Sequence, residues 1–75
     1  MKLSELRKGE SGIILDVEMN VAGSRLMEMG VTPGVRVIIL NKALFGDPIS
    51  VQLPGSTIVL RKKEANLVII QKTGN

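Results

Sequence analysis

The sequence lacks several residue types that proteins use for chemistry or for covalent stability. Its 75 residues include no cysteine, histidine, tryptophan or tyrosine, and Phe45 is the only aromatic residue. Without cysteine the chain forms no disulfide and no thiolate metal site. Without histidine it lacks the commonest general base and metal-binding nitrogen, so serine nucleophiles have no such base to activate them. No G-x-x-x-x-G-K-[ST] phosphate loop is present. These absences argue against an enzyme.

The remaining metal-ligand candidates are carboxylates. Asp16 with Glu18, and Glu28 with Asp47, are candidate donor pairs, although surface acids are usually solvated and bind no metal. Oxygen ligands alone do not select a transition metal over Mg²⁺ or Ca²⁺. We therefore expect no tight metal site and no cofactor.

Length and charge favour one small domain spanning residues 1–75. A chain this short has room for a thin core and no deep cavity. No apolar run reaches the roughly 18 residues of a membrane span, and residues 1–10 are too polar for a signal peptide. We expect a cytoplasmic protein without direct membrane insertion.

The net charge is +3, but a single-stranded nucleic-acid binder normally has more stacking aromatics, so we expect no nucleic-acid partner.

Short alternating apolar segments predict five strands, at residues 11–17, 35–40, 49–53, 57–61 and 67–71. A helix is expected at 22–29, and shorter helical turns at 2–10, with Ser4 as N-cap, and at 62–66. The pattern predicts an all-β fold, a small five-stranded SH3-like barrel with one short α-helix in an early connection. An OB-like barrel is the alternative.

Alternation also predicts which side chains share a face of the sheet. In the first strand, Ile13, Leu15 and Val17 are expected on one face, with Ile14 pointing away. Ile38 and Ile69 are likewise expected to point outward. Strands with apolar residues on both faces leave an exposed apolar patch, which often marks a binding site, unless the helix and the termini cover it.

Glycine and proline residues fit turns and caps better than a phosphate site. Gly30 follows the helix, where a left-handed cap favours glycine. The structural turn and cap residues are expected to be Gly30, Pro33, Gly34, Gly46, Pro48 and Gly55.

Four residues are candidates for contact with a partner. Leu26 and Met29 lie one turn apart on the predicted helix, and Leu44 and Phe45 form the most apolar loop. If helix and loop share one side of the barrel, these residues frame a single hydrophobic groove for a partner segment or a second copy of the chain. Otherwise they complete the core.

Three segments resemble the bacterial ferrous iron transport protein A (FeoA) family. Residues 25–34 resemble its R-L-x-x-M-G-x-x-P-G pattern, residues 46–48 its G-D-P loop, and residues 60–65 its L-R-x-x-E-A ending. The match covers nearly the whole chain in the right order. Similar motifs occur in the C-terminal module of iron-dependent repressors.

The resemblance implies a cytosolic SH3-like barrel that assists or regulates ferrous iron uptake. Its implied partner is the cytosolic region of the membrane ferrous iron transporter FeoB, which contains a GTP-binding domain, and self-association stays open. The alternative is a weak metal-binding or metal-sensing module. The lack of histidine and cysteine argues against direct carriage of iron.

Overall fold

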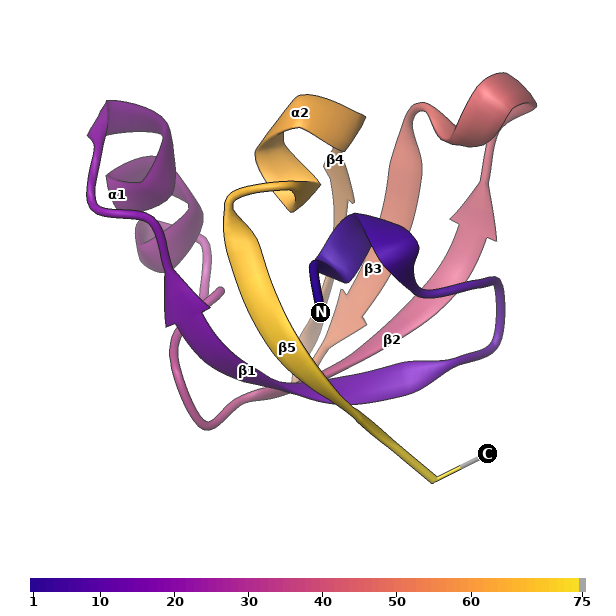
Figure 1. Ribbon diagram of the computed structural model, residues 1–75, viewed down its shortest axis with the longest axis horizontal. Coiled ribbons are helices and arrows are strands. Elements are labelled where there is room, and N and C mark those ends of the chain that lie inside the picture. Colours follow the sequence, from indigo (N-terminus) through magenta and orange to yellow (C-terminus); the bar gives the residue numbers. More distant parts are fainter. Residues whose placement is uncertain (75) are drawn as a thin grey trace.

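A computed structural model describes residues 1–74 as one antiparallel sheet of five strands with short helices around it. The elements are η1 (Leu3–Glu5), β1 (Ser11–Val17), α1 (Val21–Glu28), β2 (Arg36–Lys42), η2 (Leu44–Gly46), β3 (Ile49–Leu53), β4 (Ser56–Leu60), α2 (Lys62–Ala65) and β5 (Val68–Thr73). The strand order is β4-β3-β2-β1-β5, and the sheet is strongly curved (Figure 1). The prediction of five strands and one early helix is confirmed, and strand ends differ from the expected ones by at most two residues.

One core fills the concave side of the sheet. Every strand contributes side chains to it, and both α-helices and the N-terminal segment contribute others. The buried apolar residues are Leu3, Leu6, Ile14, Val17, Leu26, Val31, Val37, Ile39, Ile49, Val51, Leu53, Leu60, Ala65, Val68 and Ile70. None is aromatic, so small aliphatic side chains supply the hydrophobic stabilisation, about 1.5–3 kcal/mol for each larger one.

The face assignment for β1 is wrong at three positions, because the strand contains a bulge. Ile14 is buried, whereas Leu15 is exposed and Ile13 only half-buried. Opposite β5 the register moves from Ile14–Ile70 to Asp16–Ile69, which makes Leu15 an extra residue. A bulge breaks the two-residue period, so Ile14 and Val17 both point inward.

Ile69 and Ile38 were both expected to point outward. Ile69 is exposed, in agreement with this prediction, whereas Ile38 is half-buried. β2 carries a second register shift, between Ile39 and Asn41 opposite β3. β3 has no shift against β4, and its alternation of Ile49, Val51 and Leu53 inward is as the sequence predicts.

The N-terminal segment closes one end of the core and covers one edge of the sheet. Ser4 is not the N-cap of η1, because the Glu5 carboxylate accepts a hydrogen bond from the Lys2 N–H, 2.6 Å away, at the start of the turn. Lys42 Nζ donates to the carbonyl oxygens of Ser4 (2.8 Å) and Leu6 (3.0 Å). Lys2 also pairs with Ile69, on the free side of β5. Strand β4, the other edge, has no such cover among residues 1–74.

An ion pair ties the loop before β1 to β5. Lys72 Nζ lies 2.5 Å from Glu10 Oε2, and the Arg7 N–H donates to Glu10 Oε1 at 2.7 Å. The Lys72 ammonium first, and then this N–H, lower the pKa of the Glu10 carboxyl below its usual value. No helix within residues 1–74 is long and apolar enough to cross a membrane.

Helix α1 begins at a tightly packed corner. The Asn20 side chain caps it by accepting a hydrogen bond from the Gly23 N–H at 2.7 Å, as N-cap asparagines commonly do. Gly23 lies against the preceding chain, and a Cβ placed on it would be 1.8 Å from the Glu18 carbonyl oxygen. Gly23 is therefore required by this close approach of two backbone segments.

We expect Gly23→Ala to lower the free energy of unfolding by about 2 kcal/mol or more, because the clash is with backbone and cannot be relieved by a side-chain rotation. The exposed neighbour Ser24→Ala is the matched control and should change it by less than about 0.5 kcal/mol. Urea unfolding followed by circular dichroism measures both. Equal stability of the two variants would contradict the close approach.

Candidate functional site

The structure distributes the four predicted partner-binding residues unequally between core and surface. Leu26 is 0% exposed, whereas Met29, Leu44 and Phe45 are 44%, 78% and 89% exposed. The prediction that Leu26 contacts a partner is therefore wrong for this conformation. Leu26 points from α1 into the core, where the helix buries the middle of its apolar face.

The expected single groove is also wrong. Figure 1 shows α1 on one side of the molecule and the η2 turn, which follows β2, on the opposite side. Helix and loop thus share no surface, and Met29 is separated from Leu44 and Phe45. The exposed candidates, Met29 on one side and Leu44 with Phe45 on the other, belong to two separate surfaces instead.

The first, here the α1 surface, consists of Met19, Val21, Arg25 and Met29. Val21, Arg25 and Met29 follow one another at four-residue spacing, so they lie along one exposed side of the helix. Met19 is 82% exposed and Val21 75%. Among residues 1–74 no ion pair involves Arg25. The surface thus combines three apolar side chains with one free guanidinium.

The second, here the η2 tip, consists of Leu44 and Phe45. Phe45 has φ +61°, a left-handed conformation that side chains with a Cβ rarely adopt. Three backbone hydrogen bonds hold the turn, from the Gly46 N–H to the Ala43 carbonyl (2.8 Å), from the Ala43 N–H to the Pro48 carbonyl (2.9 Å) and from the Asp47 N–H to the Leu44 carbonyl (3.4 Å). The turn presents both apolar side chains to solvent.

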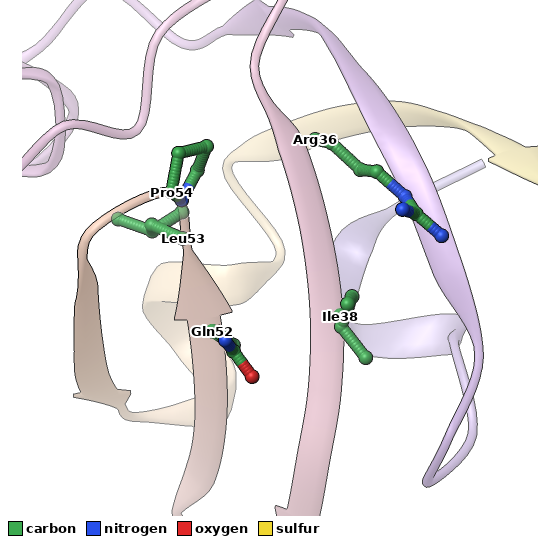
Figure 2. A pocket seen from close by; sticks show the side chains of 5 residues that line it. All are labelled: Arg36, Ile38, Gln52, Leu53 and Pro54. Carbon is green, nitrogen blue, oxygen red and sulfur yellow. The ribbon is translucent and has the colours of Figure 1, made fainter.

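A shallow pocket on the outer face of β2 and β3 is too small for a cofactor. It measures about 180 Å³, whereas ligand sites usually span about 300–1,000 Å³. It is lined by Arg36, Ile38, Gln52, Leu53 and Pro54. In Figure 2 the Arg36 side chain, the one charged group among them, extends away from Pro54. The lining therefore offers no pair of acid and base.

Within residues 1–74, the carboxylates proposed as metal donors belong to no larger cluster of possible metal ligands. Among residues 1–74 no three side chains of histidine, cysteine, aspartate or glutamate lie together as a metal site would need. Asp16 Oδ1 accepts a hydrogen bond from the N–H of its neighbour Val17 at 2.9 Å. Asp47 is engaged with Arg61 and Lys62.

With this geometry in place, the sequence comparisons decide the family. Residues 1–72 match the model of the FeoA domain. The chain belongs to the FeoA family.

Relatives link this family to ferrous iron transport. A Porphyromonas gingivalis protein, a fusion of Fe(2+) transport protein A with Fe(2+) transporter FeoB, is 29% identical over 72 residues, which is 95% of this chain and 8% of that protein. The solution structure of a Chlorobium tepidum FeoA protein superposes with a TM-score of 0.88 at 33% identity, covering 99% of this chain and 71% of that one.

The crystal structure of Stenotrophomonas maltophilia FeoA complexed with zinc is described as that of a prokaryotic SH3 domain protein. It has a TM-score of 0.85 and 30% identity, covering 95% of this chain and 89% of that one. The predicted SH3-like fold is thereby confirmed.

The FeoA pattern in residues 25–34 separates into buried and exposed members. Leu26 is core, and Gly30 has φ +100° directly after the helix, a conformation that favours glycine. Arg25 and Met29 of the same pattern are exposed. The sequence analysis did not name Arg25 as a partner-binding residue. Its presence in the FeoA pattern and its position outside the apolar face of the helix were together a signal that could have identified it.

The remaining predicted turn residues take the places that their types favour. Gly34, Gly46 and Gly55 also have positive φ angles, between +76° and +91°. Pro33 precedes Gly34 in the turn after α1, and Pro48 follows Asp47 through a cis peptide bond. None of these residues lines the pocket.

The other two FeoA segments meet in space at Asp47. Its Oδ1 accepts a hydrogen bond from the Lys62 N–H at 3.1 Å and lies 3.8 Å from an Arg61 guanidinium nitrogen. Glu64 closes the same helix start by accepting from the Arg61 N–H at 2.8 Å. The G-D-P loop and the L-R-x-x-E-A ending therefore form one joint between η2 and α2.

We expect Asp47→Ala to lower the free energy of unfolding by about 1 kcal/mol, because the start of α2 loses a cap and Arg61 its ion partner. Glu18→Ala, an exposed acid outside this joint, is the control and should cost less than about 0.5 kcal/mol. Chemical denaturation gives both values. If the two substitutions cost the same, the joint does not stabilise the fold.

Proposed function

We propose that this protein is a non-catalytic accessory of bacterial ferrous iron uptake that acts in the cytoplasm by contact with the cytosolic region of FeoB. The observation that carries the proposal is the exposure of Arg25 and Met29, two members of the FeoA pattern outside the core. The P. gingivalis fusion supports it, because that protein joins transport protein A and FeoB. Fusion holds two modules at high effective concentration, which favours contact between them.

The composition of the α1 surface suits protein contact. Arginine and methionine are enriched at interfaces, and arginine is frequent among the residues that dominate binding energy. Methionine side chains adapt their shape to a partner. The small pocket, with Arg36 as its one charged lining residue, gives no comparable support to a catalytic role.

We expect Arg25→Ala and Met29→Ser each to weaken binding to the purified cytosolic region of FeoB by about tenfold, the loss typical of a dominant interface residue. Both positions are exposed, so circular dichroism spectra and melting temperatures should stay near those of the unmodified protein. Biolayer interferometry measures the affinity.

Val59→Ser is the matched control for this experiment, because Val59 is an exposed apolar residue on β4, outside the α1 surface. It should bind as the unmodified protein does. Unchanged affinity of both folded α1 variants would place the contact elsewhere, and no binding by the unmodified protein would contradict the proposed partner.

A weak metal-binding module is the second candidate, and the zinc complex of the S. maltophilia protein favours it. The available donors are carboxylate oxygens, which favour Fe²⁺ little over abundant Mg²⁺. A tight, selective iron site would need nitrogen or sulfur ligands, and the chain has neither histidine nor cysteine.

We therefore expect no tight Fe²⁺ site. Anaerobic titration calorimetry should give only weak heats that excess Mg²⁺ suppresses. A stoichiometric isotherm with submicromolar affinity, unaffected by Mg²⁺, would contradict the accessory role and favour the metal module.

A further inference from the structure

The η2 tip is an apolar projection, and the fold does not use its side chains. Leu44 and Phe45 are adjacent and largely exposed, and neither belongs to the core. The left-handed backbone at Phe45 is a conformation in which glycine or asparagine would be less strained. The only aromatic residue of the chain thus occupies a solvent-facing position where a smaller residue would serve the turn better.

Cationic residues lie beside the base of this tip. The Asp47 joint brings Arg61 and the start of α2, with Lys62 and Lys63, next to η2. All three cations are exposed. The nearby acids are Asp47, which pairs with Arg61, and Glu64, which accepts a hydrogen bond from the Arg61 N–H and keeps its negative charge. Three cations thus lie beside two anions, which leaves a net charge of +1, and Lys62 and Lys63 are the cations that form no ion pair among residues 1–74.

An apolar tip above a cationic base matches the chemistry of an anionic membrane surface. Apolar side chains enter the boundary between headgroups and acyl chains, while lysine and arginine reach lipid phosphates. Each signal alone gives only marginal, reversible binding, and stable anchoring takes two. The tip projects from the molecule (Figure 1), which suits a deformable bilayer better than a preformed protein pocket.

We propose that Leu44 and Phe45, with Arg61, Lys62 and Lys63 at their base, form a peripheral contact for anionic phospholipid bilayers. The η2 tip lies on the side of the molecule opposite α1, whereas α2, which carries Lys62 and Lys63, lies between them and contacts α1 (Figure 1). This contact goes beyond the proposed function, because it involves lipid and a different surface. A protein bound to FeoB through the α1 surface would have the η2 tip free for the membrane that holds the transporter.

The test uses the purified full chain and vesicles without transporter, made of phosphatidylcholine alone or with an equal part of phosphatidylglycerol. The protein should sediment with the anionic vesicles at low salt, release at high salt, and ignore the neutral ones. Phe45→Ser should lower the partition coefficient by about tenfold. Lys62→Gln and Lys63→Gln should each lower it by about fivefold.

Two substitutions outside the tip serve as controls. Val59→Ser removes an exposed apolar group on β4, and Arg36→Gln removes an exposed charge at the start of β2. Both should leave vesicle binding unchanged apart from a small loss of general charge attraction. Circular dichroism confirms that each variant is folded.

A spectroscopic reading locates the contact independently of affinity. The chain has no tryptophan, so Phe45→Trp introduces a single fluorophore at the tip. Its emission should shift to the blue with anionic vesicles, and that of Val59→Trp should not.

Three results would overturn the proposal. The first is that the unmodified protein does not bind anionic vesicles. The second is that Phe45→Ser binds these vesicles as well as the unmodified protein does. The third is that Phe45→Ser loses FeoB binding in detergent while its vesicle binding is unchanged, which would make the tip a protein contact. Failure of the α1 variants to weaken FeoB binding is a separate outcome, because the vesicles hold no transporter.

Discussion

The pairing of β1 on both sides is the constraint on which the rest of the fold depends. β1 joins β2 through Ser11–Ile13 and β5 along its whole length, with Leu15 as the extra residue. Beyond that shared part, Ile14 bonds to the turn after α1, since its N–H donates to the Val35 carbonyl and its carbonyl accepts from the Gly34 N–H. The strand thus leaves β2, curves the sheet and sets α1 over one end of the core. A bulge allows this bend without losing the inward side chains on either side of it.

The sequence pattern predicted most where structure is local. The regular strand at Ile49–Leu53 and the helix near 22–29 depend on alternation and periodicity within the segment, and both were close to the observed elements. The faces of Ile14 and Leu15 could not be predicted, because the bulge is fixed by the register with a strand more than 50 residues away in sequence. The placement of α1 relative to η2 is likewise a property of the curved five-stranded sheet as a whole, and for that reason the single groove was wrong.

The family pattern combines residues with different physical roles. Leu26, Gly30 and Asp47 are explained by burial, backbone conformation and a helix cap within this one chain. Arg25 and Met29 have no comparable internal role, and the fold leaves them on the surface. A sequence motif therefore becomes informative about function only after the residues that the fold itself requires have been set aside.

The two edge strands of the sheet differ in their ability to pair with a further strand. The margin formed by β5, Val68–Thr73, is occupied at Ile69 by the pairing with Lys2. The margin formed by β4, Ser56–Leu60, carries no charge, proline or bulge, the features by which proteins usually discourage a further strand. Extension of the sheet is thus directional: an additional strand, from a partner or from a second copy, has backbone groups to pair with at β4 and not beside Lys2.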